Sequence, residues 1–184
     1  MERRQKKTRN AIYAALTSLL ETKNYSSITV KDIIDKADVG RSTFYTHFET
    51  KDDLLKSLCT EIFEHVFSDP LKRESTHDFS AGKRDLKEEL THILYHLQGK
   101  ESPVRRLLSS ESGEIFMNVF KKHLEKVFHG ELEKPKGNVP ESYLLDFTVN
   151  GFAETVRWWM RHGEYPPEEV SGFFLDSMPF LRGT

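Results

Sequence analysis

The side chains best suited to binding chemistry in this 184-residue chain are concentrated in one short segment, residues 41–47. Six of them can bond a phosphate or the edge of a base: Arg41, Ser42, Thr43, Tyr45, Thr46 and His47. Arg41 is the strongest base-reading candidate, because a guanidinium can bond both O6 and N7 of guanine. Ser42 and Thr43 can also bond bases, and the Thr43 methyl group can press on thymine. Tyr45, His47 and the nearby Lys51 have the chemistry of phosphate anchors, so this segment favours DNA recognition.

Two short helices are predicted to position these side chains. The first begins after Thr29, which can cap it with Asp32 as a capping-box partner, and Thr29 could also contact a phosphate. Its buried stripe consists of Val30, Ile33, Ile34 and Ala37. After a tight break, the second helix covers about 41–47, with Phe44 and Phe48 anchoring its inner face. Two short helices joined by such a turn form a helix-turn-helix, whose second helix fits the major groove. The pattern therefore predicts a sequence-specific DNA-binding regulator.

The remainder of the chain also has helical periodicity, since few runs alternate with period two. Helices are expected over about 7–21, from Thr50 onward, and over about 86–97, 104–108, 115–128, 141–162 and 166–181. Polar loops are expected at 68–82 and 130–140. The predicted fold is therefore all-α, with a three-helix DNA-binding domain in residues 1–50 and a helical ligand- or partner-binding and dimerisation domain in residues 51–184.

Charge is distributed unevenly along the chain. The net charge is −2, yet residues 1–47 hold nine Lys or Arg against five Asp or Glu, a net of +4, which leaves −6 for the rest. A basic head on an acidic body localises attraction to phosphates at one end. Arg3, Arg4, Lys6, Lys7 and Arg9 lie before or at the start of the first expected helix. They form either a solvated disordered tail or a basic arm that lies across DNA phosphates or in a minor groove.

The spacing of ten residues between 29 and 54 is specific to a known protein family. These residues are Thr29, Ile33, Ala37, Val39, Thr43, Phe44, Tyr45, Phe48, Lys51 and Leu54. The pattern resembles the DNA-binding domain of TetR-type (TetR/AcrR) transcriptional regulators, over roughly the first third of the chain. The resemblance implies a three-helix reading head, followed by a divergent helical bundle that binds a ligand or partner and dimerises through its last two helices.

The chain departs from that family's usual pattern at the turn. Asp38 stands where the family commonly has Gly, and Gly40 where it commonly has Ser. Because Asp tolerates left-handed backbone better than most residues, the turn remains feasible. Residues 156–170, VRWWMRHGEYPPEEV, resemble a subgroup that includes activators of dihydroxyacetone kinase operons.

Aromatic residues are frequent in the second part of the chain, and helical spacing of aromatics usually indicates a core. A ligand cavity is the functional alternative, with Phe116, Phe120, Phe147 and Trp158 as its candidate lining. Adjacent residues on a helix point about 100° apart, so Trp158 and Trp159 can both be buried only if their helix packs on two sides. A homodimer interface achieves this, and its candidate residues are Phe152, Trp159, Phe173 and Phe174.

Other reactive residues give weaker signals. Cys59 is expected to be a small core residue, not a nucleophile. His92 and His96 could share a metal, but no third ligand is evident, so a packed pair is favoured and neither a metal nor a cofactor is expected. An enzyme is the rival class of function, but the sequence shows no nucleophile–base pair, no phosphate-binding glycine loop and no carboxylate pair beyond the acids of helix starts, so no enzyme is expected. With no signal peptide and no apolar run of membrane-spanning length, a cytoplasmic protein is expected.

The expected mechanism follows from the size of one reading helix, which offers too little affinity and information alone. Two heads related by two-fold symmetry double both, and imply a palindromic operator with half-sites about 34–36 Å apart or a multiple of that. The favoured hypothesis is a homodimeric repressor released by a small-molecule ligand. The alternative is an activator or co-activator whose C-terminal domain binds a protein partner.

Overall fold

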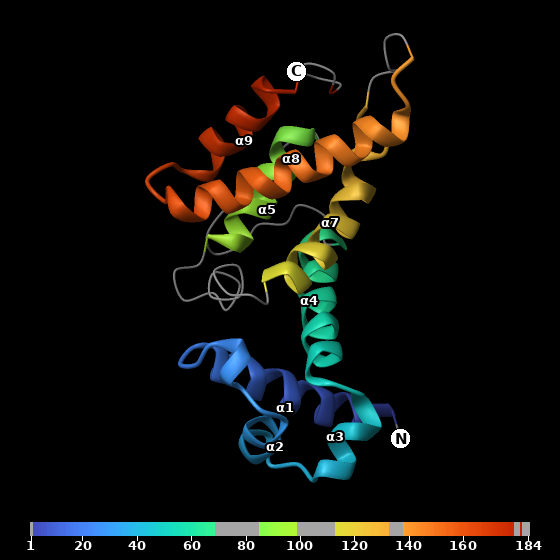
Figure 1. Ribbon diagram of the computed structural model, residues 1–184, viewed down its shortest axis with the longest axis vertical. Coiled ribbons are helices and arrows are strands. Elements are labelled where there is room, and N and C mark those ends of the chain that lie inside the picture. The colour runs from blue at the N-terminus through green and yellow to red at the C-terminus, as the bar shows by residue number, and fades with distance from the viewer. Residues whose placement is uncertain (1, 69–84, 99–112, 133–137, 179–180, 182–184) are drawn as a thin grey trace. The chain divides into compact units, whose positions relative to one another are not determined.

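The computed structural model describes residues 2–68, 85–98, 113–132, 138–178 and 181, and every regular element in these residues is a helix (Figure 1). The elements are α1 (Glu2–Leu20), the 3-10 helix η1 (Tyr25–Ser27), α2 (Val30–Ala37), α3 (Arg41–His47), α4 (Lys51–Ser68), α5 (Leu86–Leu97), α7 (Gly113–Phe128), α8 (Glu141–Arg161) and α9 (Pro167–Asp176). The predicted all-α class is confirmed. The short helix predicted at 104–108 lies outside the described residues.

The chain divides into two compact units. Among the described residues, 2–62 and 113–117 belong to the first unit, and 63–98 together with those from 118 onward belong to the second. The units divide within α4 and within α7, whereas the predicted domain boundary lies after residue 50, at the start of α4.

The core of the first unit forms around α1, which packs against α2. The fully buried side chains of this core include Ile12, Leu16 and Leu20 of α1, Ile33 of α2 and Phe44 of α3. The three α1 residues are spaced by four, which places them on one helix face, the apolar face that predicted this helix. The first three α-helices therefore form the three-helix head expected from the sequence.

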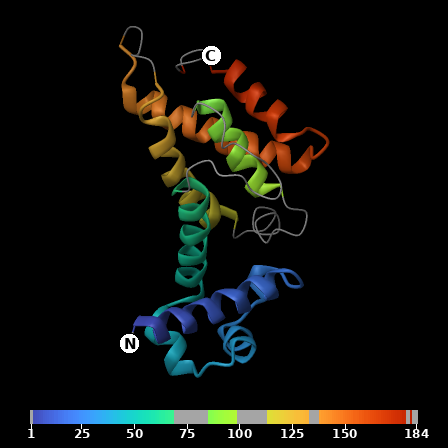
Figure 2. The same cartoon turned by 180° about the vertical axis from the view of Figure 1, so that it is seen from behind.

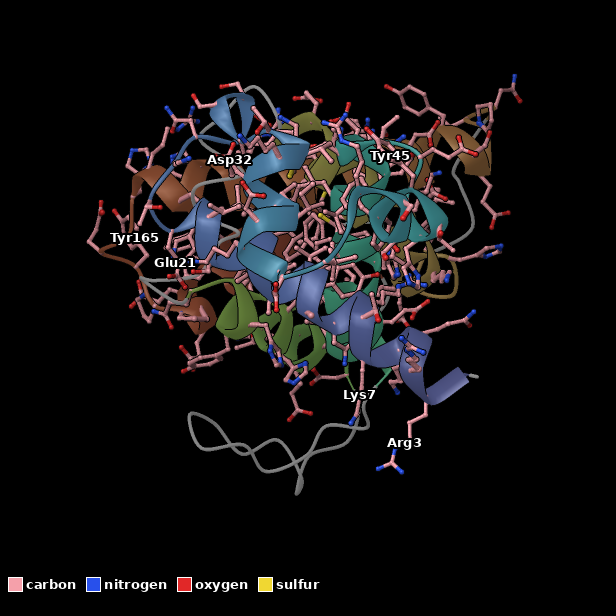
Figure 3. The ribbon with its side chains drawn as sticks, turned by 90° about the horizontal axis from the view of Figure 1, so that it is seen from below. Arg3, Lys7, Glu21, Asp32, Tyr45 and Tyr165 are labelled. Atoms are coloured by element: carbon pink, nitrogen blue, oxygen red, sulfur yellow. The ribbon has the colours of Figure 1, made fainter. Side chains whose placement is uncertain are left out.

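The first helix is longer than the sequence analysis predicted, because it begins at Glu2 and not at about Lys7. Arg3, Arg4 and Lys6 consequently lie on α1, and neither a disordered tail nor an arm preceding the helix describes them. Figure 3 shows Arg3 and Lys7 projecting from this end of α1. Arg, Lys and Gln have high helix propensity, and residues 2–20 contain no Gly or Pro, which explains the extension.

The start of α2 is fixed by the predicted capping box. The Thr29 hydroxyl accepts a hydrogen bond from the Asp32 N–H at 3.1 Å, and the Thr29 N–H donates to the Asp32 carboxylate at 2.8 Å. Lys23 adds an ion pair to the same carboxylate at 2.9 Å. These bonds, first those from Thr29 and then that from Lys23, hold the pKa of Asp32 below its usual range. Their contribution to stability is therefore present at neutral pH and is lost as the pH falls through that lowered pKa.

The second unit is organised by α5, α8 and α9, which Figures 1 and 2 show side by side. Asp85 caps α5 by accepting a bond from the Glu88 N–H at 2.8 Å. A buried hydrogen bond of 2.8 Å joins the Thr91 and Ser171 hydroxyls, and so links α5 to α9. Aromatic rings fill the core of this unit, with Phe152 and Phe174 in an edge-to-face contact 5.0 Å between centroids.

The last helix is shorter than predicted, since α9 ends at Asp176 and not near Leu181. Beyond it, Met178 is buried, and Leu181 forms an isolated antiparallel bridge with Leu132. A Cβ added at Gly151 of α8 would lie 2.6 Å from the Met178 Cε atom. The absence of a side chain at position 151 therefore lets the end of the chain approach α8 closely.

Loss of the Thr29 cap is expected to weaken the fold of the first unit. Thr29→Ala should lower the free energy of unfolding by about 1 kcal/mol, because the Asp32 N–H loses the hydroxyl oxygen that accepts its hydrogen bond. The measurement is urea unfolding at pH 7. Thr60→Ala is the matched control, because its hydroxyl bonds only the Lys56 carbonyl one turn back within α4. An equal drop in stability in both variants would contradict a capping role for Thr29.

Candidate DNA-binding site

The helix α3 has two chemically different faces, as the sequence predicted. Phe44 and Phe48, at its inner face and its C-cap, are buried, and their ring centroids lie 5.9 Å apart. The polar set lies on the other side, where Arg41, Ser42, Tyr45 and Thr46 are exposed and Thr43 and His47 are half-buried. Tyr45 is 49% exposed although its ring contacts the edge of Phe44, so its hydroxyl is available to a partner. The arrangement presents base-reading and phosphate-binding groups on one helix surface.

The turn before α3 adopts the backbone that Asp38 was expected to tolerate. Asp38 has φ 51° and ψ 49°, and it is the one described non-glycine residue with positive φ. Its N–H and that of Val39 both bond the Ile34 carbonyl, which closes α2. Gly40 supplies no side-chain cap to α3, but α3 still begins at Arg41, with the Phe44 N–H bonded to the Gly40 carbonyl at 3.1 Å. The helix α3 therefore starts where the sequence predicted, without a side-chain cap.

The basic residues of α1 extend the site beyond α3. Lys6 and Arg9 line a shallow depression of about 370 Å³ together with His47 from the end of α3. Arg9 is held in place, since its guanidinium bonds the Tyr13 hydroxyl at 2.6 Å and also the Ser57 hydroxyl. The structure thus brings predicted phosphate-binding residues from α1 and α3 onto one surface, within which Arg9 is positioned by α4.

Lys51 lies differently from the other predicted phosphate anchors, because its ammonium is directed onto two main-chain carbonyls, those of residues 25 and 28. Thr29 occupies the cap position already described, at the exposed start of α2. Four residues that tie these elements together were not predicted from the sequence: Tyr25, Asp52, Tyr13 and Ser57. Their bonds join residues 27 and 44 positions apart in the chain, and no local periodicity reports such contacts.

The residues predicted to line a ligand pocket differ in burial and in their neighbours within the described part of the chain. Phe116 and Phe120 are fully buried, and Phe147 is 49% exposed and stacked on Tyr143. Trp158 lines a groove of about 320 Å³ between α8 and α9, with Gly151, Glu154, Thr155, Phe173, Phe174, Ser177 and Met178. Its ring stacks on His162 at 4.5 Å and on Tyr165 at 5.5 Å. The sequence did not separate core aromatics from surface aromatics.

The four predicted dimer-interface residues also divide by burial. Phe152, Trp159 and Phe174 are buried within the second unit of a single chain, so they have no appreciable surface to offer a partner. Phe173 is 43% exposed. A dimer was one way expected to bury both Trp158 and Trp159, but the second unit buries Trp159 by itself while Trp158 stays half-buried. The Trp159 indole N–H donates to the Tyr165 carbonyl at 2.8 Å.

The other reactive residues noted in the sequence are Cys59, His92 and His96, and the burial of the cysteine and the contact between the two histidines indicate structural roles. Cys59 is buried, and burial raises the pKa of its thiol to about 12, as expected of a core residue. His92 and His96 are hydrogen-bonded to each other, with their Nε2 atoms 3.1 Å apart. Among the described residues, no cluster of three or more His, Cys, Asp or Glu side chains is arranged to hold a metal ion. Within the same part of the chain, no helix is long and apolar enough to cross a membrane.

Comparisons with known proteins match both parts of the chain. The family model described as bacterial regulatory proteins, tetR family, matches residues 12–58, and one described as a transcriptional regulator C-terminal region matches residues 84–178. Over 71 residues the chain is 37% identical to an uncharacterized HTH-type transcriptional regulator, YxbF of Bacillus subtilis. Over 58 residues it is 38% identical to the HTH-type transcriptional regulator EthR of Mycolicibacterium smegmatis. These matches cover 36% and 32% of this chain, and 19% and 27% of the two relatives.

Solved structures extend the likeness to nearly the whole chain. A TetR transcriptional regulator from Streptococcus agalactiae 2603V is 35% identical, with a TM-score of 0.72 and 96% of each chain covered. The dihydroxyacetone kinase operon activator DhaS has a TM-score of 0.61 over 94% of each chain, at 17% identity. DhaS is therefore similar in fold, in keeping with the resemblance noted for residues 156–170.

The left-handed turn gives a direct test of how α3 is held. Asp38→Ala should destabilise the first unit by about 1 kcal/mol, because a Cβ without a hydrogen-bonding group tolerates positive φ poorly. Asp38→Gly should equal or exceed the original protein in stability, because glycine adopts this backbone without steric cost. Thermal unfolding of the two variants measures the difference. Equal destabilisation by Ala and Gly would show that the Asp38 side chain, and not the backbone, fixes the turn.

Proposed function

The chain belongs to the TetR family of bacterial transcriptional regulators, and from this premise we propose that it binds a palindromic operator as a homodimer through the outer face of α3. The observation that carries the proposal is the separation of α3 into a buried aromatic face and an exposed polar face. Members of this family are regulators and not enzymes. A cytoplasmic location is part of the proposal, because the operator is there.

In the proposed complex α3 enters the major groove. Arg41 reads a guanine, and Ser42, Thr43 and Thr46 contact neighbouring base edges or sugars. Tyr45, His47 and Thr29 bond phosphates on either side, since they flank the exposed face of α3 or cap the start of α2. Arg3, Arg4 and Lys6 continue the basic surface along α1, where they add phosphate contacts without base information.

The second unit offers a surface for self-association on α8 and α9. Large apolar side chains are exposed there, with Tyr143 at 59%, Phe147 at 49% and Phe173 at 43%. Residues 143, 147, 151, 154 and 158 follow one face of α8, so the aromatic pair precedes, along the helix, the groove beside Trp158. A two-fold axis near Gly151 would place the aromatic pair of each chain opposite the groove of its partner, as an isologous interface requires.

We further propose that the protein is a repressor whose operator affinity falls when a small molecule binds the second unit. In one shape of the dimer the distance between the two DNA-binding heads matches the half-site spacing of the operator, and in the other it does not. The ligand can act only through its difference in affinity for these two shapes. The competing proposal is an activator or co-activator that binds a protein partner. Two experiments separate a small-molecule ligand from a protein partner. A thermal shift with a metabolite supports the first, and a specific protein recovered by pull-down from the native cell supports the second.

Removal of the Arg41 guanidinium should weaken operator recognition. The probe is a duplex selected from a random DNA pool, and the measurement is fluorescence anisotropy. Arg41→Ala should cost about 1–3 kcal/mol of binding free energy and relax base preference at one position of each half-site. Arg161→Ala, which removes an exposed arginine of α8, is the control and should leave binding unchanged. If the two variants bind alike, α3 does not read the operator.

The proposed dimer surface can be tested without DNA. Phe147→Ala should raise the dimer dissociation constant by at least about fivefold, because an exposed aromatic anchor is worth more than about 1 kcal/mol in an interface. Sedimentation velocity over a range of concentrations gives the constant. Tyr45→Ala is the matched control, since Tyr45 is equally exposed but lies on α3. An unchanged constant for Phe147→Ala would remove the exposed face of α8 from the interface.

A further inference from the structure

The Lys51 side chain forms a cluster of bonds at the start of α4 that DNA contact does not explain. Its Nζ atom donates to the Tyr25 carbonyl at 2.8 Å and to the Ile28 carbonyl at 2.7 Å. It also lies 4.2 Å from the centroid of the Tyr25 ring. Residues 25–28 comprise η1 and the residue just before Thr29, the cap of α2. Lys51 therefore adds a charged donor to two carbonyls of the segment that leads into α2, of which the Tyr25 carbonyl also accepts from the Ile28 N–H at 3.1 Å.

Asp52, the next residue of α4, binds the other end of the same tyrosine. The Tyr25 hydroxyl donates to the Asp52 carboxylate at 2.6 Å, and the Tyr25 side chain is buried. Burial and this hydrogen bond raise the pKa of Tyr25 well above its usual range, so the phenol stays a donor at any physiological pH. The first turn of α4 thus binds Tyr25 at two points, with Lys51 bonded to its main-chain carbonyl and Asp52 to its phenol.

These bonds restrict what Lys51 can do at a DNA surface. An ammonium has three N–H donors, and the two carbonyls occupy two of them. Swinging the side chain onto a phosphate would leave the Tyr25 and Ile28 carbonyls without this charged donor, and such hydrogen bonds are stronger than neutral ones. Lys51 is also half-buried, and this burial lowers the pKa of its ammonium.

We propose that Lys51 is a positioning residue for DNA recognition and not a phosphate ligand. With Asp52 and Tyr25 it forms a clamp that fixes the entry of α2, and hence the tilt of α3, relative to the first turn of α4. The inference rests on the proposed function, because tilt matters only if α3 reads a groove. The charge of Lys51 alone would suggest that it binds a phosphate, whereas the proposed role is to position α2 and α3. The element that sets the angle of the reading helix is then α4.

The salt dependence of DNA binding separates a positioning lysine from a phosphate-binding one. Removing one phosphate-bound cation lowers the slope of log affinity against log salt by about 0.9, so a cation that both chains of a dimer supply accounts for about 1.8. Selectivity gives a second readout, defined as affinity for the selected duplex divided by affinity for a scrambled duplex of equal length. A tilted α3 reads fewer bases and so lowers selectivity, whereas removal of a phosphate ligand or a smaller folded fraction weakens binding to both duplexes alike.

The experiment measures both quantities for the full-length protein and for Lys51→Met, which keeps the length of the side chain but not its charge. The expected result is an unchanged salt slope with selectivity reduced about tenfold or more. Tyr25→Phe, which keeps the ring beneath Lys51 and removes the bond to Asp52, should lower selectivity in the same sense without altering the slope. Lys51→Arg should restore part of the selectivity, because a guanidinium can donate to both carbonyls.

Two results would overturn the proposal. A slope reduced by about 1.8 with selectivity intact would make Lys51 a phosphate ligand. Equal weakening on both duplexes at constant slope and constant selectivity would reduce its role to folding. If the unaltered protein shows no selectivity for any duplex in the pool, the proposed function itself fails before a variant is compared, so the two failures are distinguishable.

Discussion

Burial of Phe44 and Phe48 is the interaction on which the reading surface depends. Helix α3 has seven residues, which is too short to be stable in water on its own, so tertiary packing must hold it. The two rings attach its inner face to the core of the first unit, and Tyr13 extends that contact at 5.8 Å from Phe48. With the inner face fixed, the exposure of Arg41, Ser42, Tyr45 and Thr46 follows from helical periodicity alone.

The orientation of α3 is set at both ends of α2. At its start, the Thr29 capping box and the clamp of Lys51, Asp52 and Tyr25 act on adjacent residues of one segment. At its end, the left-handed Asp38 redirects the chain within three residues. These devices act at both ends of α2, the helix that leads into α3, so together they hold the short helix α3 in one orientation.

Much of the first unit could be predicted from the sequence, because its signals are local. The capping box, the bounds of α3, its two Phe anchors and the left-handed tolerance at Asp38 all lie within a few residues of their causes. The clamp could not be predicted, since Tyr25 and Asp52 lie far apart in the chain and neither belongs to a periodic pattern. The reach of α1 to Glu2 was missed because charge was taken as a sign of disorder, although arginine and lysine are good helix formers.

The second unit was predicted less well, because aromatic residues serve opposite purposes on the same helices. Phe147 and Phe152 lie on α8, yet the first is half exposed and the second fully buried. Their positions differ by five residues, which on a helix turns a side chain to another face, but the sequence does not say which face the core lies on. Partner helices decide this, and α9 fixes it through the contact of Phe174 with Phe152.

A hydroxyl-radical footprint of the protein on its selected duplex tests the central claim most directly, that the outer face of α3 enters DNA as one of a symmetric pair. The account predicts two protected patches related by a dyad, centred about 34–36 Å apart or a multiple of that distance. A single asymmetric patch, or protection spread evenly along the duplex, would contradict it.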